Sequence, residues 1–348
     1  MTSCPDELPR NRETNAFERR VAAVLGAHLS EAEPVVVACS GGPDSVAALI
    51  ATVRGRPGVL VTAACFDHRL REASETEGDV AFVRDVARRV GACFVSGAPS
   101  VELGGDEAGA RQARYGWLAE VCGAQDASVC VTGHTEDDQA ETVLLRLTRG
   151  SGLRGAAGMR VESAWPVAVG LAETPAAPPG GASGERLRVL RPLLDVSRAE
   201  VEGYLEALGL EARVDPTNEL VTYARNRVRR RVLPELEELN AGAKRHLAAF
   251  AERAAQDDAA LAEWAARELR THGVVEAGSV KLTRTSLKAC PPAISTRVVQ
   301  LAAGKLGLEL TSEQLSGALR ALWRGGFRVS IVGGEVRTEG EYLVIRQD

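Results

Sequence analysis

Residues 40–45 have the types and spacing needed to hold a phosphate. They read Ser-Gly-Gly-Pro-Asp-Ser and follow a valine-rich run over residues 35–39. Glycines let the backbone approach an anion, and the N–H groups that open a following helix point at it. The segment is no Walker A loop, since it has no lysine and carries Asp44 instead. A carboxylate beside a nucleotide suits Mg²⁺ or a cationic group. We therefore expect a nucleotide site at Ser40, Gly41, Gly42, Pro43, Asp44 and Ser45. The alternative is an ordinary turn whose Ser and Asp cap a helix.

A second group crowds negative charge into residues 133–142, which read Gly-His-Thr-Glu-Asp-Asp-Gln-Ala-Glu-Thr. Like charges at helical spacing repel by roughly 0.2–0.5 kcal/mol per pair. The helix dipole offsets part of this cost, so simple capping is the alternative interpretation. A divalent metal or a substrate ammonium would relieve the crowding more fully. The candidate catalytic residues here are His134, Asp137, Asp138 and Glu141.

Arginines form the third kind of group, in a chain whose net charge of −5 gives no overall sign of nucleic-acid binding. Arg111 and Arg114 are three apart and share one helix face. A run over residues 225–231 reads Arg-Asn-Arg-Val-Arg-Arg-Arg, a local basic footprint typical of RNA contact. Its alternative is a solvated helix end paired with Glu235, Glu237 and Glu238. The candidate RNA-binding residues are Arg111, Arg114, Arg225, Arg227, Arg229 and Arg230.

Alternating strand and helix patterns must position these groups. Apolar runs predict strands over residues 35–39, 59–66, 93–96 and 128–132, with helices over 45–54, 75–90, 110–122 and 137–148. This alternation predicts an α/β fold with a doubly wound, mostly parallel sheet. Ligands bind such sheets at the carboxyl ends of the strands. The phosphate loop, the segment Asp67–Arg71 and the acidic segment all follow predicted strands.

The remaining sequence predicts a second, smaller and mainly helical domain. We expect short strands over 165–169 and 188–192, a helix capped by Ser197, and helices over 226–239, 243–256, 257–270, 292–305 and 312–323. A short β segment is expected at 273–282, and a terminal β-ribbon at 327–332 and 342–346. The predicted divisions are a tail (1–20), a catalytic domain (21–215) with a flexible insertion (170–186), a linker helix (216–240) and a substrate-binding domain (241–348).

Composition excludes several classes of protein. At 45% hydrophobic and 26% charged residues, the chain resembles an ordinary globular protein. The polar N-terminus lacks the apolar stretch of a secretory signal, and no apolar run is long enough to span a bilayer. The seven cysteines are scattered without a Cys-x-x-Cys pair. We therefore expect a cytoplasmic protein that does not bind a membrane. We expect its cysteines to be reduced core residues.

Together, these motifs resemble the PP-loop ATP pyrophosphatase superfamily and, within it, the tRNA(Ile)-lysidine synthase family. Ser-Gly-Gly-x-Asp-Ser at residues 40–45 carries the superfamily resemblance. The family resemblance lies in the combination of segments 67–71, 111–115, 133–142 and Asp215-Pro216-Thr217-Asn218 before the arginine run. It covers roughly residues 35–239. The chain departs from the family in its 170–185 loop and in stopping where longer members carry a further domain.

The resemblance implies a two-step reaction that uses ATP, Mg²⁺, L-lysine and tRNA(Ile) with a CAU anticodon. ATP activates C2 of the wobble cytidine with release of pyrophosphate, and the amine of lysine then displaces AMP. It implies Mg²⁺ at Asp44 with Asp137 or Asp138, and lysine at one or more of Asp137, Asp138 and Glu141. The alternatives are a PP-loop tRNA thiolase, an amidotransferase-type synthetase and a catalytically dead tRNA-binding protein. Thiolases of this kind use paired cysteines, and the seven cysteines here are not paired. A homodimer is left open.

Overall fold

The computed structural model describes residues 8–67, 73–99, 107–166, 187–211, 213, 224–324 and 326–348. The chain forms two compact units, Met1–Glu252 and Arg253–Asp348. Their division falls inside helix α10 (Ala243–His272), whereas the sequence placed a domain boundary at residue 240. Each unit has its own sheet and its own apolar core.

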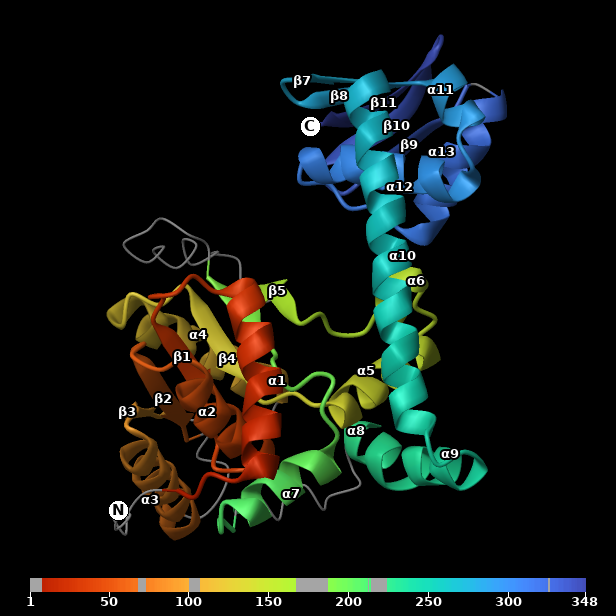
Figure 1. The fold of residues 1–348 in the computed structure, drawn as a ribbon. Helices are drawn as coiled ribbons and strands as arrows, with labels where there is room; N and C mark the ends of the chain where they lie inside the picture. The colour runs from red at the N-terminus through yellow and green to blue at the C-terminus, as the bar shows by residue number, and fades with distance from the viewer. Residues whose placement is uncertain are drawn as a thin grey trace. The chain divides into compact units, whose positions relative to one another are not determined.

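A six-stranded sheet forms the centre of the first unit (Figure 1). Its strand order is β3-β2-β1-β4-β6-β5, and every neighbouring pair is parallel except β5 with β6. The order reverses direction between β1 and β4, which is the switch point where α/β sheets bind ligands. The strands are β1 (Val35–Ala38), β2 (Val61–Phe66), β3 (Cys93–Gly97), β4 (Val129–Thr132), β5 (Glu162–Ala164) and β6 (Arg188–Leu190).

Helices cover both faces of this sheet. Successive side chains of a strand point to opposite faces, so each strand contributes to both apolar cores. Val35 and Val37 enter a large core on one face, and Val36 packs with Leu118 and Cys122 of α4 on the other. The helices of this unit include α1 (Arg12–His28), α2 (Pro43–Gly55), α3 (Ala73–Val90), α4 (Glu107–Ala124), α5 (Glu136–Thr148), α6 (Leu153–Ala156) and α7 (Arg198–Ala207). The prediction of a doubly wound α/β fold is confirmed.

Two details of the first unit differ from the sequence prediction. The predicted tail of residues 1–20 contains the start of α1, because Asn11 and Thr14 form a capping box that begins the helix at Arg12. A strand, β5, covers Glu162–Ala164 and pairs antiparallel with β6. Of the strand expected over 165–169, residues 165 and 166 are not in a strand, and 167–169 lie outside the described residues. The cap predicted at Ser197 is confirmed, since its side chain accepts a hydrogen bond from the Glu200 amide.

The arginine run lies on a continuous helical segment made of α8 (Ala224–Arg227), a π-helical turn (Val228–Val232) and α9 (Leu233–Leu239). Pro234 stands near the start of α9 and has no N–H to donate to the preceding turn. The Leu233 amide bonds the carbonyl of Val228, five residues back, so the helix widens there. Val228 and Leu233 pack with Ala140 of α5, which holds the arginine run against the acidic helix.

The second unit is built on a five-stranded antiparallel sheet with order β7-β8-β11-β10-β9. Its strands are β7 (Gly273–Glu276), β8 (Ser279–Thr283), β9 (Arg328–Ile331), β10 (Gly334–Glu339) and β11 (Tyr342–Gln347). Its helices, besides the end of α10, are α11 (Arg284–Ala289), α12 (Pro292–Lys305) and α13 (Ser312–Arg324).

Two sequence predictions are corrected in this unit. The two helices expected over 243–256 and 257–270 are one helix, α10, because no residue between them breaks the helical pattern. The terminal ribbon is part of a full sheet: β11 pairs on its other edge with β8, a long-range contact that local pattern does not reveal.

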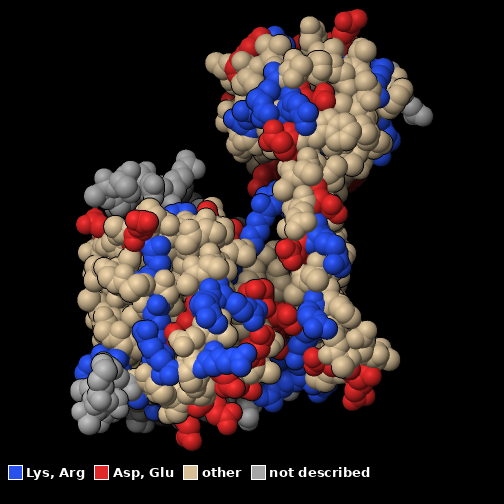
Figure 2. Space-filling view, in the orientation of Figure 1, with Lys and Arg blue, Asp and Glu red and all other residues tan. Residues whose placement is uncertain are grey.

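The surface carries charges of both signs. In the view of Figure 2, acidic and basic side chains lie interspersed. No helix within the described residues has the length and apolar character required to cross a membrane. Among the six described cysteines, Cys39, Cys65, Cys122 and Cys130 are buried, in line with the sequence. Cys93 is exposed, so its prediction as a core residue was wrong.

Candidate active site

The turn between β1 and α2 leaves the N-terminus of α2 without a side-chain cap. Gly42 stands at the N-cap, and Pro43 fills the first helical position. Gly41 has a φ of +88°, a left-handed conformation that favours glycine. The Ser45 hydroxyl ties the turn together: it accepts a hydrogen bond from the Ser40 amide at 3.1 Å and donates one to the Gly42 carbonyl at 2.9 Å. Uncapped N–H groups at a helix N-terminus suit an anion.

Gly133 brings the end of β4 against this turn. A Cβ at Gly133 would lie 2.5 Å from the carbonyl oxygen of Asp44 and 2.8 Å from the amide nitrogen of Ser45. Only a residue without a side chain allows two backbones to come this close. The close approach places the start of α5 beside the start of α2, at the switch point of the sheet.

Asp44 lies in the first turn of α2 with its side chain 19% exposed. Burial raises the pKa of Asp44 to about 6, although Arg198 opposes this shift. The Arg198 guanidinium donates to Asp44 Oδ2 at 3.3 Å. The other carboxylate oxygen, Oδ1, is buried and has no hydrogen-bond partner. A buried, unpartnered carboxylate oxygen has a strong tendency to take a cation.

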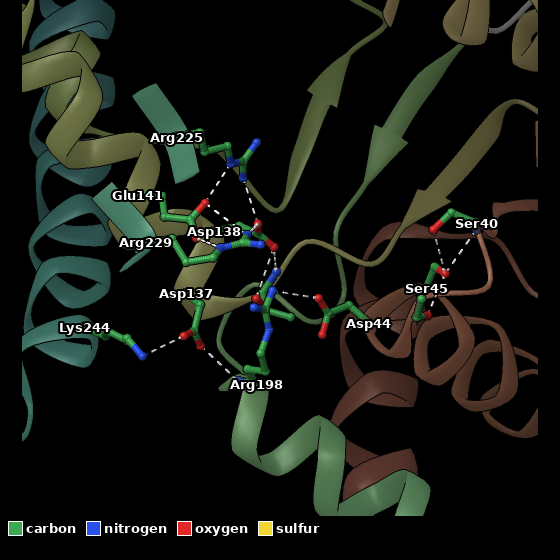
Figure 3. A network of polar contacts seen from close by, with 12 residues as sticks. Ser40, Asp44, Ser45, Asp137, Asp138, Glu141, Arg198, Arg225, Arg229 and Lys244 are labelled. Atoms are coloured by element: carbon green, nitrogen blue, oxygen red, sulfur yellow. Dashed lines mark hydrogen bonds and ion pairs between the residues drawn. The ribbon is translucent and has the colours of Figure 1, made fainter. Parts of the chain in front are cut away.

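Asp138 and Glu141 form a closed ion-pair network with two arginines of the helical segment after α7 (Figure 3). Glu141 is completely buried and accepts from Arg225 Nε at 2.7 Å and from Arg229 Nε. Asp138 Oδ1 accepts from Arg225 at 2.8 Å and from Arg229 at 3.4 Å. Asp138 Oδ2 caps α5 by accepting from the amide and hydroxyl of Thr135.

Asp137 has different partners from its two neighbours. Its Oδ2 accepts from the backbone amide of Arg198 at 3.0 Å. Its Oδ1 lies 2.9 Å from the ammonium of Lys244, which also contacts Glu237 at 3.1 Å. Figure 3 shows Lys244 reaching Asp137 from α10, on the side opposite Asp44. A primary ammonium, rather than a guanidinium, is therefore the cation at Asp137.

Arg198 links the two halves of the site. Its backbone amide bonds Asp137 of α5, and its guanidinium bonds Asp44 of α2. The capping box of Ser197 and Glu200 fixes its position at the first residue of α7. The carboxylate of the phosphate loop and the carboxylates of α5 thus meet around one arginine.

His134 follows Gly133 after the end of β4, and Thr132 Oγ1 is 2.8 Å from its Nδ1. Burial lowers the pKa of His134 to about 3, a shift that the nearby Asp138 opposes and Arg191 reinforces. The imidazole is therefore neutral at physiological pH. It can accept or donate a hydrogen bond there, but it carries no charge for a phosphate.

Arg111 and Arg114 stack on the same aromatic ring of α4. Their guanidinium carbons lie 4.8 and 5.2 Å from the ring centre of Tyr115. The Nε of Arg114 and the hydroxyl of Tyr115 are buried without a hydrogen-bond partner. Buried Arg191, at the end of β6, has an unpartnered Nε as well. These unpartnered donors, two guanidiniums and one phenol, leave hydrogen-bonding capacity for an anion.

The arginine run divides between two roles. Arg225 and Arg229 point into the site and pair with the carboxylates of α5, a partnership that the sequence did not predict. Arg227 and Arg230 are exposed. Their contact with RNA stays a prediction. Glu237, which the sequence offered as a partner for this run, pairs with Lys244 instead.

Three predicted segments lie partly or wholly outside the described residues. They are residues 68–71 of the segment after β2, the insertion at 170–186, and the turn Asp215-Pro216-Thr217-Asn218. The flexible insertion and the turn therefore stay predictions.

The donor set fits a magnesium ion bound together with a nucleotide. Asp44 and Asp138 lie close enough for the charge of Asp138 to raise the pKa of Asp44, and Asp44 Oδ1 is orphaned. Magnesium at nucleotide sites takes one or two carboxylates and completes its shell with phosphates and water. Within the described part of the chain, no three His, Cys, Asp or Glu side chains group to form an all-protein metal site.

Comparison with known proteins identifies the family of the chain. The PP-loop domain family matches residues 13–236. A tRNA(Ile)-lysidine synthase of Salinispora tropica is 42% identical over 324 residues, which cover 88% of each chain. The enzymes of the same name from Salinispora arenicola and Thermobifida fusca are 40% and 36% identical, over 92% and 89% of this chain and 92% and 91% of theirs. The chain belongs to the tRNA(Ile)-lysidine synthase family.

A solved structure supports the fold assignment for this family member. The U34-tRNA thiolase NcsA from Methanococcus maripaludis, solved with its [4Fe-4S] cluster, superposes with a TM-score of 0.52 at 18% identity. The match covers 69% of this chain and 79% of the thiolase. At that identity the likeness shows a shared PP-loop fold.

Sequence reasoning missed three residues of this lysidine synthase family site. Arg198 carried one usable signal, since it follows an evident helix cap at Ser197 on the side of the sheet that binds ligands. Arg191 and Lys244 carried none, because nothing local ties a strand end or a distant helix to the acidic segment. Their roles depend on how α7, β6 and α10 pack beside α5.

Proposed function

We propose that the chain adds lysine to C2 of cytidine 34 in tRNA(Ile) with a CAU anticodon, at the expense of ATP. The observation that carries the proposal is the meeting of Asp44 from the phosphate loop with Asp137 from the acidic helix, through Arg198. One end of this site suits a nucleotide and the other suits an amine. A reaction that activates a substrate with ATP and then adds an amine needs both in one place.

In the first step, the C2 oxygen of the cytidine attacks the α-phosphorus of ATP, and the bond to the β-phosphate breaks. Backbone N–H groups of the Ser40–Ser45 turn hold the departing pyrophosphate, as oriented donors hold charge that develops in a transition state. Asp44 would hold Mg²⁺ through its unpartnered Oδ1, and the charge of the ion would neutralise the phosphate oxygens when it is bound. Both oxygens of Asp138, the second carboxylate expected from the sequence, already accept hydrogen bonds. Arg198 orients the Asp44 carboxylate toward that position.

In the second step, the amine of lysine attacks C2, the bond from C2 to the activated oxygen breaks, and AMP leaves. The amine must lose a proton to form the new C–N bond. A carboxylate that binds the ammonium is placed to take this proton. Glu141 and Asp138 are tied to guanidiniums, so Asp137 is the carboxylate we assign to the amine.

Several exposed or stacked arginines would contact the tRNA backbone. Each phosphate contact would steepen the salt dependence of binding by about one unit. We assign this role to Arg111, Arg114, Arg227 and Arg230. Arg225 and Arg229 we assign instead to holding the carboxylates of α5 in place. The cytoplasmic location and a homodimer stay predictions from the sequence.

The test is to incubate the protein with ATP, Mg²⁺, labelled lysine and a tRNA(Ile) transcript with a CAU anticodon. We expect labelled lysine in the tRNA, with AMP and pyrophosphate released in equal amounts. A tRNA(Met) transcript, which shares the anticodon, is the specificity control. Incorporation of sulfur or ammonia in place of lysine, or no modification at all, would overturn the proposal. Asp44→Asn should abolish pyrophosphate release while the protein stays folded.

A further inference from the structure

The chain's own lysine at the acidic helix has a consequence for how substrate binds. The sequence has only four lysines (Lys244, Lys281, Lys288 and Lys305) against 38 arginines. Lys244 is the single lysine of the first unit, residues 1–252. In a chain that uses arginine nearly everywhere, the one lysine of this unit contacts Asp137, the carboxylate that holds no guanidinium side chain.

Two further carboxylates of α5, Asp138 and Glu141, are held in a way that resists exchange. Glu141 is completely buried and takes two guanidiniums, and Asp138 shares both of them while capping the helix. Removing a partner from a buried charge leaves that charge uncompensated, which is strongly unfavourable. Arginine forks also bind carboxylates through fixed pairs of hydrogen bonds. A substrate ammonium has no easy entry there.

Lys244 is held in a way that permits exchange. Its side chain is 28% exposed, and its ammonium is a compact charge on a flexible stem. It lies between two carboxylates, Asp137 at 2.9 Å and Glu237 at 3.1 Å. When another ammonium takes Asp137, Lys244 keeps Glu237, whose side chain is 34% exposed. Displacing Lys244 from Asp137 therefore leaves no buried charge unpaired.

We propose that Lys244 is a built-in competitor of the lysine substrate: its ammonium and the substrate's ammonium exchange at Asp137 Oδ1. The inference rests on the proposed function and deepens it. A competitor that holds the site for part of the time raises the apparent dissociation constant in proportion. Lys244 then sets the affinity for lysine without touching the ATP end of the site.

The decisive experiment is the KM for lysine of Lys244→Gln, at saturating ATP and tRNA. For a partly exposed ion pair, we expect a drop of about two- to fivefold. The KM for ATP and the rate of pyrophosphate release without lysine should stay at wild-type values. Equilibrium binding of labelled lysine should tighten by the same factor, a readout independent of turnover. An unchanged or raised KM for lysine would overturn the inference.

Arg245→Gln is the matched control, because it removes one positive charge from the adjacent exposed residue. If Lys244 acts only through its positive charge, Lys244→Gln and Arg245→Gln should lower the KM for lysine to the same extent. That result would also overturn the inference. Lys244→Arg covers the case in which the glutamine variant fails to fold. A guanidinium should hold Asp137 more firmly, so the KM for lysine should stay at or above the wild-type value, and a fall would refute the exchange.

These outcomes separate the two proposals. If wild-type protein fails to modify tRNA(Ile) with lysine, the proposed function fails. If it modifies tRNA but Lys244→Gln has the wild-type KM for lysine, only the proposed role of Lys244 fails.

Discussion

Replacing Gly133 with alanine tests whether backbone contact between two loops assembles the site. A Cβ at this position would lie 2.5 Å from the Asp44 carbonyl oxygen, and ordinary contact begins at 3.4 Å. The two loops must therefore separate by about 0.9 Å. Gly133 is absent from the glycines with positive φ, so alanine is compatible with its backbone angles and the strain is purely steric.

The expected effect is larger on activity than on stability. Overpacking of this kind costs typically about 1–3 kcal/mol of folding free energy. A displacement near 1 Å of groups that align a reaction costs about 100-fold in rate. We therefore expect Gly133→Ala to remain folded at 25 °C but to release pyrophosphate from ATP about 100-fold more slowly.

The assay combines urea unfolding with pyrophosphate release in the presence of tRNA(Ile). Gly116→Ala in α4 is the matched control, since a Cβ there meets nothing within 4 Å. It should retain full activity and at least wild-type stability, because alanine favours a helix over glycine. If Gly133→Ala has wild-type activity and stability, the close approach does not assemble the site and the reasoning fails.

Three further predictions follow from buried or exposed charges. Arg229→Ala should destabilise the fold by about 2 kcal/mol in urea unfolding, less than for a single buried pair because Arg225 still faces Glu141, and a neutral effect would refute the network. Arg227→Ala, on the exposed side of the same segment, should leave stability unchanged but reduce the salt slope of tRNA binding by about one; an unchanged slope would exclude a phosphate contact. Burial alone would raise the pKa of Glu33, but Ser128, the Ser30 amide and Arg188 lower it overall. Its ionised form therefore stabilises the fold above the unfolded value near 4.5, and this stability is lost as pH falls through the lower folded pKa. Glu33→Gln should consequently lose stability at pH 7 and approach the wild type in acid, and a difference that grows as pH falls would contradict this sign.

The sequence by itself determined the parts whose cause is local. The phosphate turn needs glycine at 41 for its left-handed backbone, and the acidic helix begins where Thr135 and Asp138 cap it. Apolar strands that are buried along nearly their whole length require a sheet covered on both faces. These features follow from conformational preference and apolar spacing, which act within a few residues of the chain.

Only the tertiary structure decided which charges meet. The sequence showed a run of arginines and a run of carboxylates, and it predicted that the arginines bind RNA. Val228 and Leu233 pack on Ala140, and this packing places Arg225 and Arg229 against Glu141. The two ion pairs matter because a fully buried carboxylate must be paired.

The same packing leaves Asp137 to Lys244, more than 100 positions further along the chain. No local pattern links those two residues. Which cation stands at each carboxylate depends on the approach of whole helices, and apolar contacts between those helices fix that approach.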